Sequence, residues 1–374
     1  MKKNLMKSMA VLGLFILAAA ASRAGQEAPI RAGVYMGDGA SMACVVETFE
    51  ALRIDPAIVP SLVSPTDIYT GRLDELDVIV FPGGSGSKQN NSMGSGSHAK
   101  VKEFVIEKGK GIVGLCAGGY LVSDSEGYPC LRLIGAETID RVNDKRGSAL
   151  VEVSFNKKGL AIFPEMKDHK YGYIQYHDGP VFVPPAGGYT ACEELAVNNS
   201  DVHQTGPQGI TPGKSFLLCQ DSGKGRVFAS AGHPESTVGM RWMVPRMVRW
   251  VARRELVSYP ANVMRPDLGT AEIMHSDERE TELFWKLFDD DPAVRTGAVK
   301  ELRENRYRNG FRWAAGMIRD RSPEVRAFAA EVLAAAEYTA AIDDLEAVIE
   351  EEKDNACRMR LENALADLKG IVAD

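Results

Sequence analysis

A cysteine in a glycine-rich turn constrains this chain more than any other feature of its sequence. Residues 112–115 form an apolar run as long as a buried parallel strand, and the run leads directly into Cys116. Gly114 and Gly118 flank the cysteine, and a sharp strand-to-helix turn requires such small neighbours. The pattern predicts a nucleophile elbow, in which the free N–H groups at a helix start favour the Cys116 thiolate. A buried structural cysteine is the alternative interpretation.

Strands and helices alternate in the segments around this turn. Residues 31–36, 57–63 and 77–81 are apolar runs that predict strands, and residues 42–52 predict a helix with one apolar face. Residues 132–230 contain several further short strand patterns. Because alternation at this spacing builds parallel sheets through right-handed crossovers, we expect an α/β domain with a doubly wound sheet and helices on both faces.

The carboxyl ends of the predicted strands carry candidate site residues, since ligands of doubly wound sheets bind there. Gly83 and Gly84 follow the third strand, and we expect backbone N–H groups of Gly84 and Ala117 to face an oxyanion. A simple tight turn is the alternative reading of the two glycines. Gly83 and Ser41, which lies in the turn after the first strand, are candidates for substrate contact.

A histidine follows the last predicted strand of the sheet. Residues 226–230 predict that strand, His233 follows it, and a helix is predicted over 236–256. His233 is therefore expected on the same rim of the sheet as Cys116. Glu235 lies two residues further on, where its carboxylate would orient the imidazole and complete a set of nucleophile, base and orienter.

Two further segments are expected to flank the site. Residues 85–97 are rich in Ser, Gly and Asn, with almost nothing to bury, so they predict a mobile loop that acts as a lid. Residues 173–180 place Tyr176 and His177 together before a strand, which suits a substrate-binding wall. A purely structural His177 is the alternative.

These residues together resemble the class I glutamine amidotransferase superfamily. The resemblance rests on Gly114-x-Cys116-x-Gly118, on Gly83-Gly84 after a strand, and on His233-Pro234-Glu235, in that order. Within the superfamily, residues 30–255 are most similar to the amidotransferase-like N-terminal domain of eukaryotic biotin-protein ligases, through Cys116-Ala117-Gly118 and Tyr176-x-x-Gly179-Pro180. The resemblance implies a flavodoxin-like sheet and a catalytic triad of Cys116, His233 and Glu235.

The PfpI-type members of the superfamily offer a different arrangement, in which a carboxylate from another strand end lies near the cysteine. Glu47 and Asp38 are the acidic residues to consider for that role here. Glu47 lies inside the first predicted helix, so this arrangement fits the sequence less well than the His233-Pro234-Glu235 version.

The character of the chain changes after a predicted linker over 259–275, which contains Pro260, Pro266 and Gly269. In residues 276–374, Asp291-Pro292-Ala293-Val294-Arg295 recurs 31 residues later as Ser322-Pro323-Glu324-Val325-Arg326. Helical faces at this period predict a small all-α domain of stacked helix pairs that resemble HEAT-type repeats. An unrelated helical bundle is the alternative. Such repeats usually bind proteins, so we expect docking or self-association and no catalytic group from this region.

The N-terminus predicts export. Residues 1–24 combine a basic start, an apolar core and the small-x-small sequence Ser22-Arg23-Ala24, as in a secretory signal peptide. A retained membrane anchor is the alternative, and no other stretch is long and apolar enough to span a membrane. The mature domain would then begin near residue 25, reach residue 258, and be secreted or periplasmic.

Charge and cysteine content narrow the classes of partner. The net charge of −7 argues against nucleic acid, which requires a basic face. Some of the six cysteines could pair in an oxidising compartment, Cys192 with Cys219 among them, whereas a reactive Cys116 would have to stay reduced. No metal-ligand spacing stands out among cysteines and histidines, so we expect neither a metal nor a cofactor.

The leading hypothesis from the sequence is an exported cysteine hydrolase acting on an amide or related acyl group of a small molecule or peptide. A non-catalytic protein that binds a ligand or peptide on the same scaffold is the competing class. Redox sensing by Cys116 is a third hypothesis.

Overall fold

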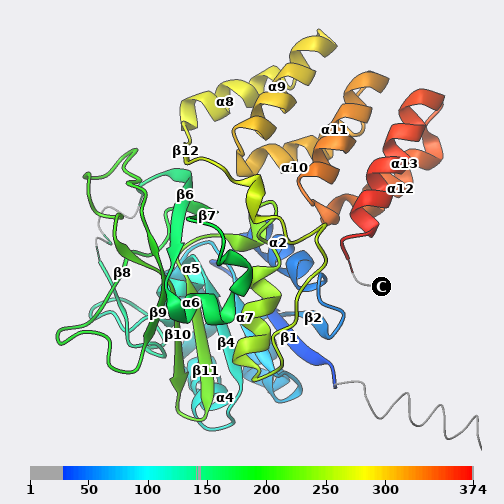
Figure 1. Cartoon of the computed structure of the whole chain (residues 1–374). Coiled ribbons are helices and arrows are strands. Elements are labelled where there is room, and N and C mark those ends of the chain that lie inside the picture. The colour runs from blue at the N-terminus through cyan, green and yellow to red at the C-terminus, as the bar shows by residue number, and fades with distance from the viewer. Residues whose placement is uncertain (1–27, 140, 142–144, 373–374) are drawn as a thin grey trace, which may run out of the picture.

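The computed structural model describes residues 28–139, 141 and 145–372, and the helical repeats stand above the strand-containing domain (Figure 1). The predicted signal peptide lies outside the described residues. Within those residues, the structure contains no helix that is both long and apolar enough to cross a membrane.

Five parallel strands form the half of the sheet that carries the cysteine. Their order across the sheet is β11-β4-β3-β1-β2. Their bounds are Ile30–Tyr35 for β1, Ile58–Val63 for β2, Val78–Phe81 for β3, Gly111–Leu115 for β4 and Gly225–Ser230 for β11. β3 and β4 are buried along their whole length, which explains why their sequences are continuous apolar runs.

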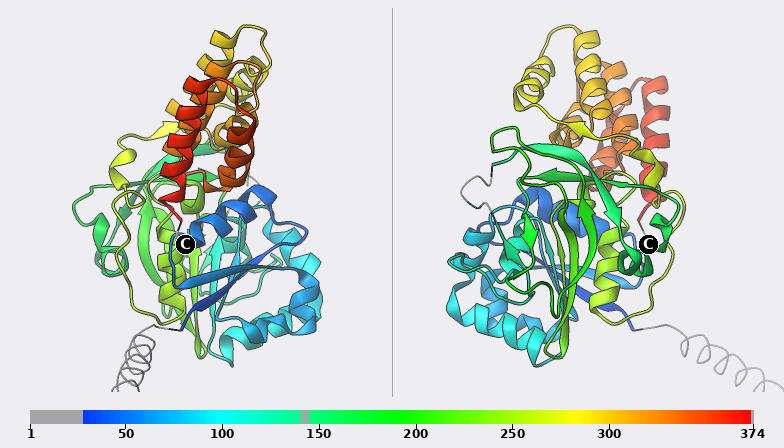
Figure 2. Two further views of the ribbon diagram at one scale, coloured as in Figure 1. Left: turned by 90° about the vertical axis from the view of Figure 1, so that its right-hand side faces the viewer. Right: turned by 60° about the vertical axis from the view of Figure 1, so that its left-hand side comes forward.

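Helices cover both faces of this parallel half, as the sequence predicts. α2 (Met42–Leu52) and α7 (Met243–Val251) contact each other on one face, and α4 (Gly86–Ile106) and α5 (Ala117–Val122) contact each other on the opposite face (Figure 2). α3 (Pro65–Thr70) packs on α4. The α/β fold class is confirmed.

Antiparallel strands extend the sheet beyond β11, so the whole sheet is mixed. β10 (Lys214–Ser222), β9 (Glu193–Asn198) and β6 (Ser148–Phe155) continue it, and β7 (Gly172–His177) and β12 (Ile273–Met274) pair with β6. Two short strands, β5 (Glu137–Thr138) and β8 (Phe182–Val183), pair with each other beside β10. β7 matters most for function, because it ends at His177 beside the elbow.

The predicted lid over residues 85–97 is wrong, because this stretch is the first half of α4. Its polar side chains are fixed by partners in the sheet domain: Gln89 Nε2 donates to the carbonyl of Pro82 at 2.9 Å, and the hydroxyls of Ser92 and Tyr35 lie 2.6 Å apart. The one non-helical residue inside α4 is Gly94, with φ of 68°. The helix predicted over 236–256 is also shorter in the structure, where α7 spans only Met243–Val251.

The C-terminal helices pack as successive pairs. Their bounds are Asp277–Lys286 for α8, Pro292–Glu304 for α9, Arg308–Met317 for α10, Pro323–Ala335 for α11, Ile342–Glu351 for α12 and Asn355–Lys369 for α13. The recurring motif marks the starts of α9 and α11, where proline occupies the first turn. Its arginines link neighbouring repeats, since Arg295 pairs with Asp320 at 2.6 Å and Arg326 with Glu352 at 2.7 Å.

The stretch 259–275 between the two regions packs against the sheet domain. The side chains of Tyr259 and Val263 in this stretch are buried. The stretch ends in β12, which pairs with the edge of β6. All six cysteines, which lie within the described residues, are free thiols, so the Cys192–Cys219 pairing is not formed.

Candidate active site

Cys116 occupies a strained turn between β4 and α5. Its φ of 49° and ψ of −103° are unusual for a residue with a side chain. The packing around the turn explains its glycines: a Cβ on Gly114 would lie 2.3 Å from the carbonyl oxygen of Gly118, and one on Gly118 would lie 2.1 Å from that of Phe81. The chain therefore has the geometry of a nucleophile elbow.

The Cys116 thiol is nearly buried, and its pKa is raised. The residue is 5% exposed, and its Sγ donates a hydrogen bond to the carbonyl oxygen of His177 at 3.5 Å. Burial raises the pKa of the Cys116 thiol, the neighbouring Cys44 and Glu235 raise it further, and Arg308 lowers it less. Burial thus opposes the thiolate that the sequence pattern predicts, and the backbone N–H of Ala117 at the helix start offsets only part of this effect.

His233 and Glu235 form a buried pair just beyond β11. His233 Nδ1 lies 2.7 Å from Glu235 Oε1, and the two residues are 1% and 0% exposed. Burial raises the pKa of Glu235, but the charges of His233 and Arg308 outweigh it and hold the pKa below its usual value. The carboxylate therefore accepts the Nδ1 proton of the imidazole.

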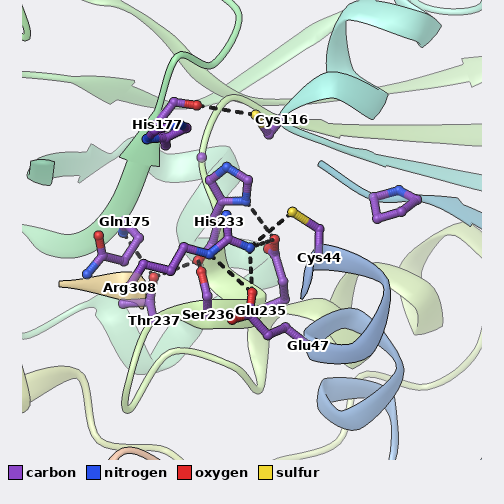
Figure 3. A network of polar contacts seen from close by, with 12 residues as sticks. Cys44, Glu47, Cys116, Gln175, His177, His233, Glu235, Ser236, Thr237 and Arg308 are labelled. Carbon is purple, nitrogen blue, oxygen red and sulfur yellow. Dashed lines mark hydrogen bonds and ion pairs between the residues drawn. The ribbon is translucent and has the colours of Figure 1, made fainter. Parts of the chain in front are cut away.

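The other nitrogen of the His233 ring is vacant. Nε2 is buried and has no hydrogen-bond partner among the described residues. In Figure 3 the ring lies between Glu235 and Cys116. Cys116 and His233 thus line the same cavity, but the thiol bonds to the carbonyl of His177 and not to the imidazole, and the cysteine whose sulfur lies within 4.8 Å of both His233 and Glu235 is Cys44.

Gly83 lies directly against His233, and Gly84 lies against the turn at Gly39–Ser41. A Cβ on Gly83 would lie 2.6 Å from His233 Cε1, so only glycine leaves room for the ring. Gly84 forms a bridge with Ala40 whose hydrogen bonds run from Ser41 N–H to Gly83 C=O and from Ser85 N–H to Gly39 C=O. The bridge leaves the Gly84 N–H unused, whereas the N–H of Ala117 approaches the Cys116 sulfur.

A cavity of about 280 Å³ opens beside Cys116. Six of the predicted site residues line it: Ser41, Gly84, Cys116, Tyr176, His177 and His233. The other three, Gly83, Ala117 and Glu235, do not line it.

Tyr176 and His177 contribute to the wall in different ways. The hydroxyl of Tyr176 donates to the carbonyl of Gly179 at 2.7 Å, so this buried side chain is held in place by its own turn. The His177 imidazole is 58% exposed, and its pKa is lowered, chiefly by partial desolvation at the cavity wall, whereas Asp178 opposes this shift. Its carbonyl, and not its ring, holds the Cys116 thiol.

Sequence reasoning missed the residues behind His233. Cys44 and Glu47 come from the buried face of α2, and Arg308 comes from the first turn of α10 in the repeats. Arg308 donates to Cys44 Sγ at 3.1 Å and to Glu47 Oε2 at 3.1 Å through Nε. The repeats therefore do place a charged group at the site, and Glu47 bonds to this arginine, unlike the cysteine-bound acid of the PfpI-type arrangement.

Further cavity residues also come from outside the sheet domain. Asn309 and Arg312 extend from α10, Glu280 from α8, and His275 from the end of β12. A signal for Cys44 and Glu47 existed, because residues three apart share one helix face. None existed for Arg308, which lies 261 positions from its partner Glu47 in the sequence.

Comparison with known families matches both parts of the chain. Residues 31–129 match the model of the biotin-protein ligase N-terminal domain, and residues 281–366 match HEAT repeats. The chain joins a biotin-protein ligase N-terminal-like domain to HEAT repeats. Both resemblances expected from the sequence motifs are confirmed. No curated protein matches the chain significantly.

Several solved structures are similar in part. A ThuA-like protein from Parabacteroides merdae is 13% identical, with 63% of this chain and 94% of that chain covered and a TM-score of 0.43. A β-galactosidase from Bacillus circulans is 14% identical, with 60% and 31% covered and a TM-score of 0.38. A protein from Anabaena variabilis with DJ-1/ThiJ/PfpI-like and ferritin-like domains is 11% identical, with 91% and 92% covered and a TM-score of 0.28.

Proposed function

We propose that this protein is an exported, thiol-dependent hydrolase that acts on an amide or related acyl substrate. The observation that carries the proposal is the strained backbone of Cys116, a non-glycine residue at φ 49°, on a cavity that is also lined by His233, whose Nε2 has no hydrogen-bond partner among the described residues. Strain of this kind persists only where the surrounding structure enforces it, and it concentrates at reactive sites.

The proposed chemistry assigns one role to each residue. His233 Nε2 accepts the proton of the Cys116 thiol, and the sulfur attacks the acyl carbon of the substrate. Glu235 holds the proton on Nδ1, so Nε2 is the acceptor. The leaving amine takes the proton from His233, and water then attacks the resulting thioester and releases the acid and the free thiol.

Backbone groups would stabilise the charge that forms during this attack. The N–H groups of Gly84 and Ala117 are the proposed oxyanion hole, because the bridge at Gly84 leaves its N–H unused and Ala117 starts α5 beside the sulfur. The cavity of about 280 Å³ is at the small end of the range for ligand pockets. It therefore suits a small amide or one residue at the end of a peptide.

The HEAT repeats support a role in protein interaction, since such arrays usually present surfaces to other proteins. Export rests on the basic and apolar composition of residues 1–24. N-terminal sequencing of protein recovered from the native host tests this part of the proposal. A chain that retains residues 1–24 in the cytoplasm contradicts it.

One observation favours a second candidate, a non-catalytic protein that binds a small ligand or peptide. The Cys116 thiol bonds to the His177 carbonyl, and burial raises its pKa, so the resting sulfur is a weak nucleophile. The two candidates differ in whether His233 activates the thiol.

Alkylation with iodoacetamide separates the two candidates. The labelling rate of Cys116 is followed by mass spectrometry near neutral pH, with the partly exposed Cys130 of the same chain as an internal reference. The hydrolase proposal expects Cys116 to react faster than Cys130, and His233→Ala to slow Cys116 alone by at least tenfold, within the ~10²–10⁴-fold range of general base catalysis. Equal rates at both cysteines, unchanged by His233→Ala, favour the binding protein.

A further inference from the structure

The side chain of Arg308 crosses from the HEAT repeats into the amidotransferase-like domain. Arg308 begins α10, and its side chain is 16% exposed. Its guanidinium lies beside Glu235, on the side of the His233 ring away from Cys116 (Figure 3). Arg308 Nη2 lies 3.1 Å from Cys44 Sγ and 3.6 Å from Glu235 Oε1, and the same side chain forms an ion pair with Glu47. One cation from the repeats thus contacts three groups of the sheet domain.

Glu235 needs a cation beside it. Its carboxylate is fully buried, and burying an ionised carboxylate is costly unless it is paired. His233 Nδ1 lies 2.7 Å from Oε1, and Oε2 has no hydrogen-bond partner among the described residues. The guanidinium of Arg308 is the positive charge that the ion pairs of the structure place next to Glu235. The other titratable groups facing this cluster are Cys44 and Glu47 from α2, Cys116 from the elbow and His177 from β7.

We propose that Arg308 is a positioning residue of the thiol site: it keeps Glu235 charged and directed at His233 Nδ1, so that Nε2 stays free to accept the Cys116 proton. This proposal rests on the proposed function. Arg308 lines the cavity and contacts the Cys44 sulfur, but the Cys116 thiol bonds to the His177 carbonyl, so the proposed effect of Arg308 on Cys116 acts through the carboxylate. Its consequence is that the repeats are part of the active site, because the reactivity of Cys116 depends on how α10 is seated against α2.

The test measures the rate of Cys116 alkylation by iodoacetamide as a function of pH, with the full chain. In Arg308→Met, which keeps the volume and loses the charge, we expect the rate at pH 7.5 to fall about tenfold and the midpoint of the profile to move by about one pH unit, the equivalent of one pKa unit. Arg308→Lys keeps a cation without the planar fork and should recover part of the rate.

Arg295→Met is the matched control. Arg295 is another repeat arginine with a buried side chain, 3% exposed, that pairs with Asp320 and does not contact the His233–Glu235 pair. Arg295→Met should lower the melting temperature, whereas the pH profile of Cys116 alkylation should remain that of the wild type. A purely structural role for Arg308 predicts instead that both variants shift the profile alike, and that result overturns the proposal.

Two comparisons separate this proposal from the proposed function. If His233→Ala slows the alkylation of Cys116 and a folded Arg308→Met does not, Arg308 is not a positioning residue. The proposed activation of Cys116 by His233 is then unaffected. If His233→Ala leaves the rate of Cys116 alkylation unchanged, both proposals fail, because His233 then does not activate the thiol. Should Arg308→Met not fold, Arg308→Gln, which also lacks the charge, carries the test, and a wild-type profile in that variant overturns the proposal.

Discussion

Backbone strain at Cys116 should be measurable as stability. The residue adopts φ 49° and ψ −103°, which costs a non-glycine residue about 1–3 kcal/mol, whereas glycine adopts positive φ freely. Glycine also loses about 0.5–1 kcal/mol more chain entropy than alanine on folding. We therefore expect Cys116→Gly to be more stable than Cys116→Ala by about 1 kcal/mol in urea unfolding.

The same pair of substitutions at Cys219 is the control for this prediction. Cys219 is buried in the middle of β10 in ordinary strand geometry, so there alanine should be the more stable replacement. If alanine is the more stable replacement at Cys116 as well, the turn at Cys116 is unstrained.

The glycines around the elbow report on how closely helix and strand approach. A Cβ on Gly118 would lie 2.1 Å from the carbonyl oxygen of Phe81 on β3, and backbone cannot move aside cheaply. We expect Gly118→Ala to destabilise the protein by about 1–3 kcal/mol, as overpacking does in well-packed cores. The measurement is the free energy of unfolding in urea, with the alkylation of Cys116 as a second readout.

Gly316→Ala serves as its matched control. Gly316 also lies in a helix, α10, but no atom lies within 4 Å of a Cβ at that position. Alanine should there stabilise the helix by about 0.5–1 kcal/mol. If both substitutions raise stability, the close contact between α5 and β3 is not real.

His275 connects the edge strand β12 to the repeats and gives this element an acid sensitivity. Its Nε2 lies 2.9 Å from the carbonyl of Asn305, and its ring stacks on Tyr307. Burial lowers the pKa of His275 to about 4 from a usual 6.5, although the Asn305 carbonyl opposes this shift. The unfolded chain binds the proton more readily, so the contribution of His275 to stability is complete above pH 6.5 and is lost as the pH falls towards 4.

The size of that loss follows from the pKa change and is about 3 kcal/mol at most. Chemical denaturation at pH 7 and at pH 4.5 should show it as a lower free energy of unfolding. His275→Gln, which cannot be charged, should lose less stability between the two pH values than the wild type does. An equal loss in both proteins would assign the acid sensitivity to other groups.

At the level of elements, local patterns predict most of the parallel half of the sheet and the starts of two repeat helices, but not α4. The first helix, the strands at β1 to β4 and the elbow follow from apolar runs and glycine positions, and the recurring Pro-x-Val-Arg motif marks the starts of α9 and α11. The predicted lid failed because the polar residues of α4 are stabilised by contacts with distant groups such as Tyr35 and Pro82. Composition alone does not reveal partners of that kind.

At the level of the whole molecule, the sequence describes each region but not how they meet. The motifs bring Cys116, His233 and Glu235 to one rim because strand ends meet at one edge of a parallel sheet. No sequence pattern joins Arg308 to Glu47, or the backbone of Arg306 to Gln175, whose Nε2 donates to it at 2.6 Å. The candidate site therefore contains a wall that only the packing of the repeats on the sheet domain creates.

Glu337 should determine whether the two regions unfold together. This carboxylate, at the end of α11, is fully buried and accepts hydrogen bonds from Gly239 N–H at 3.1 Å and from Arg265 Nε at 3.0 Å, both outside the repeats. Removing one partner of a buried ion pair costs about 3–5 kcal/mol, because the other charge stays buried. Since this cost falls on the contact between the regions, we expect Glu337→Ala to split thermal unfolding into two transitions.

Glu331→Ala, in α11 just before the turn that holds Glu337, is the control for that prediction. Glu331 pairs with Arg360 at the surface, where its side chain is 44% exposed, and such pairs contribute about 0–1 kcal/mol. Differential scanning calorimetry should therefore show the wild-type profile for Glu331→Ala and two separated peaks for Glu337→Ala. A single peak at the wild-type temperature in Glu337→Ala would mean that the docking of the repeats depends on other contacts. The contacts of Arg308 with Cys44 and Glu47 on α2 are then the ones that hold the two regions together.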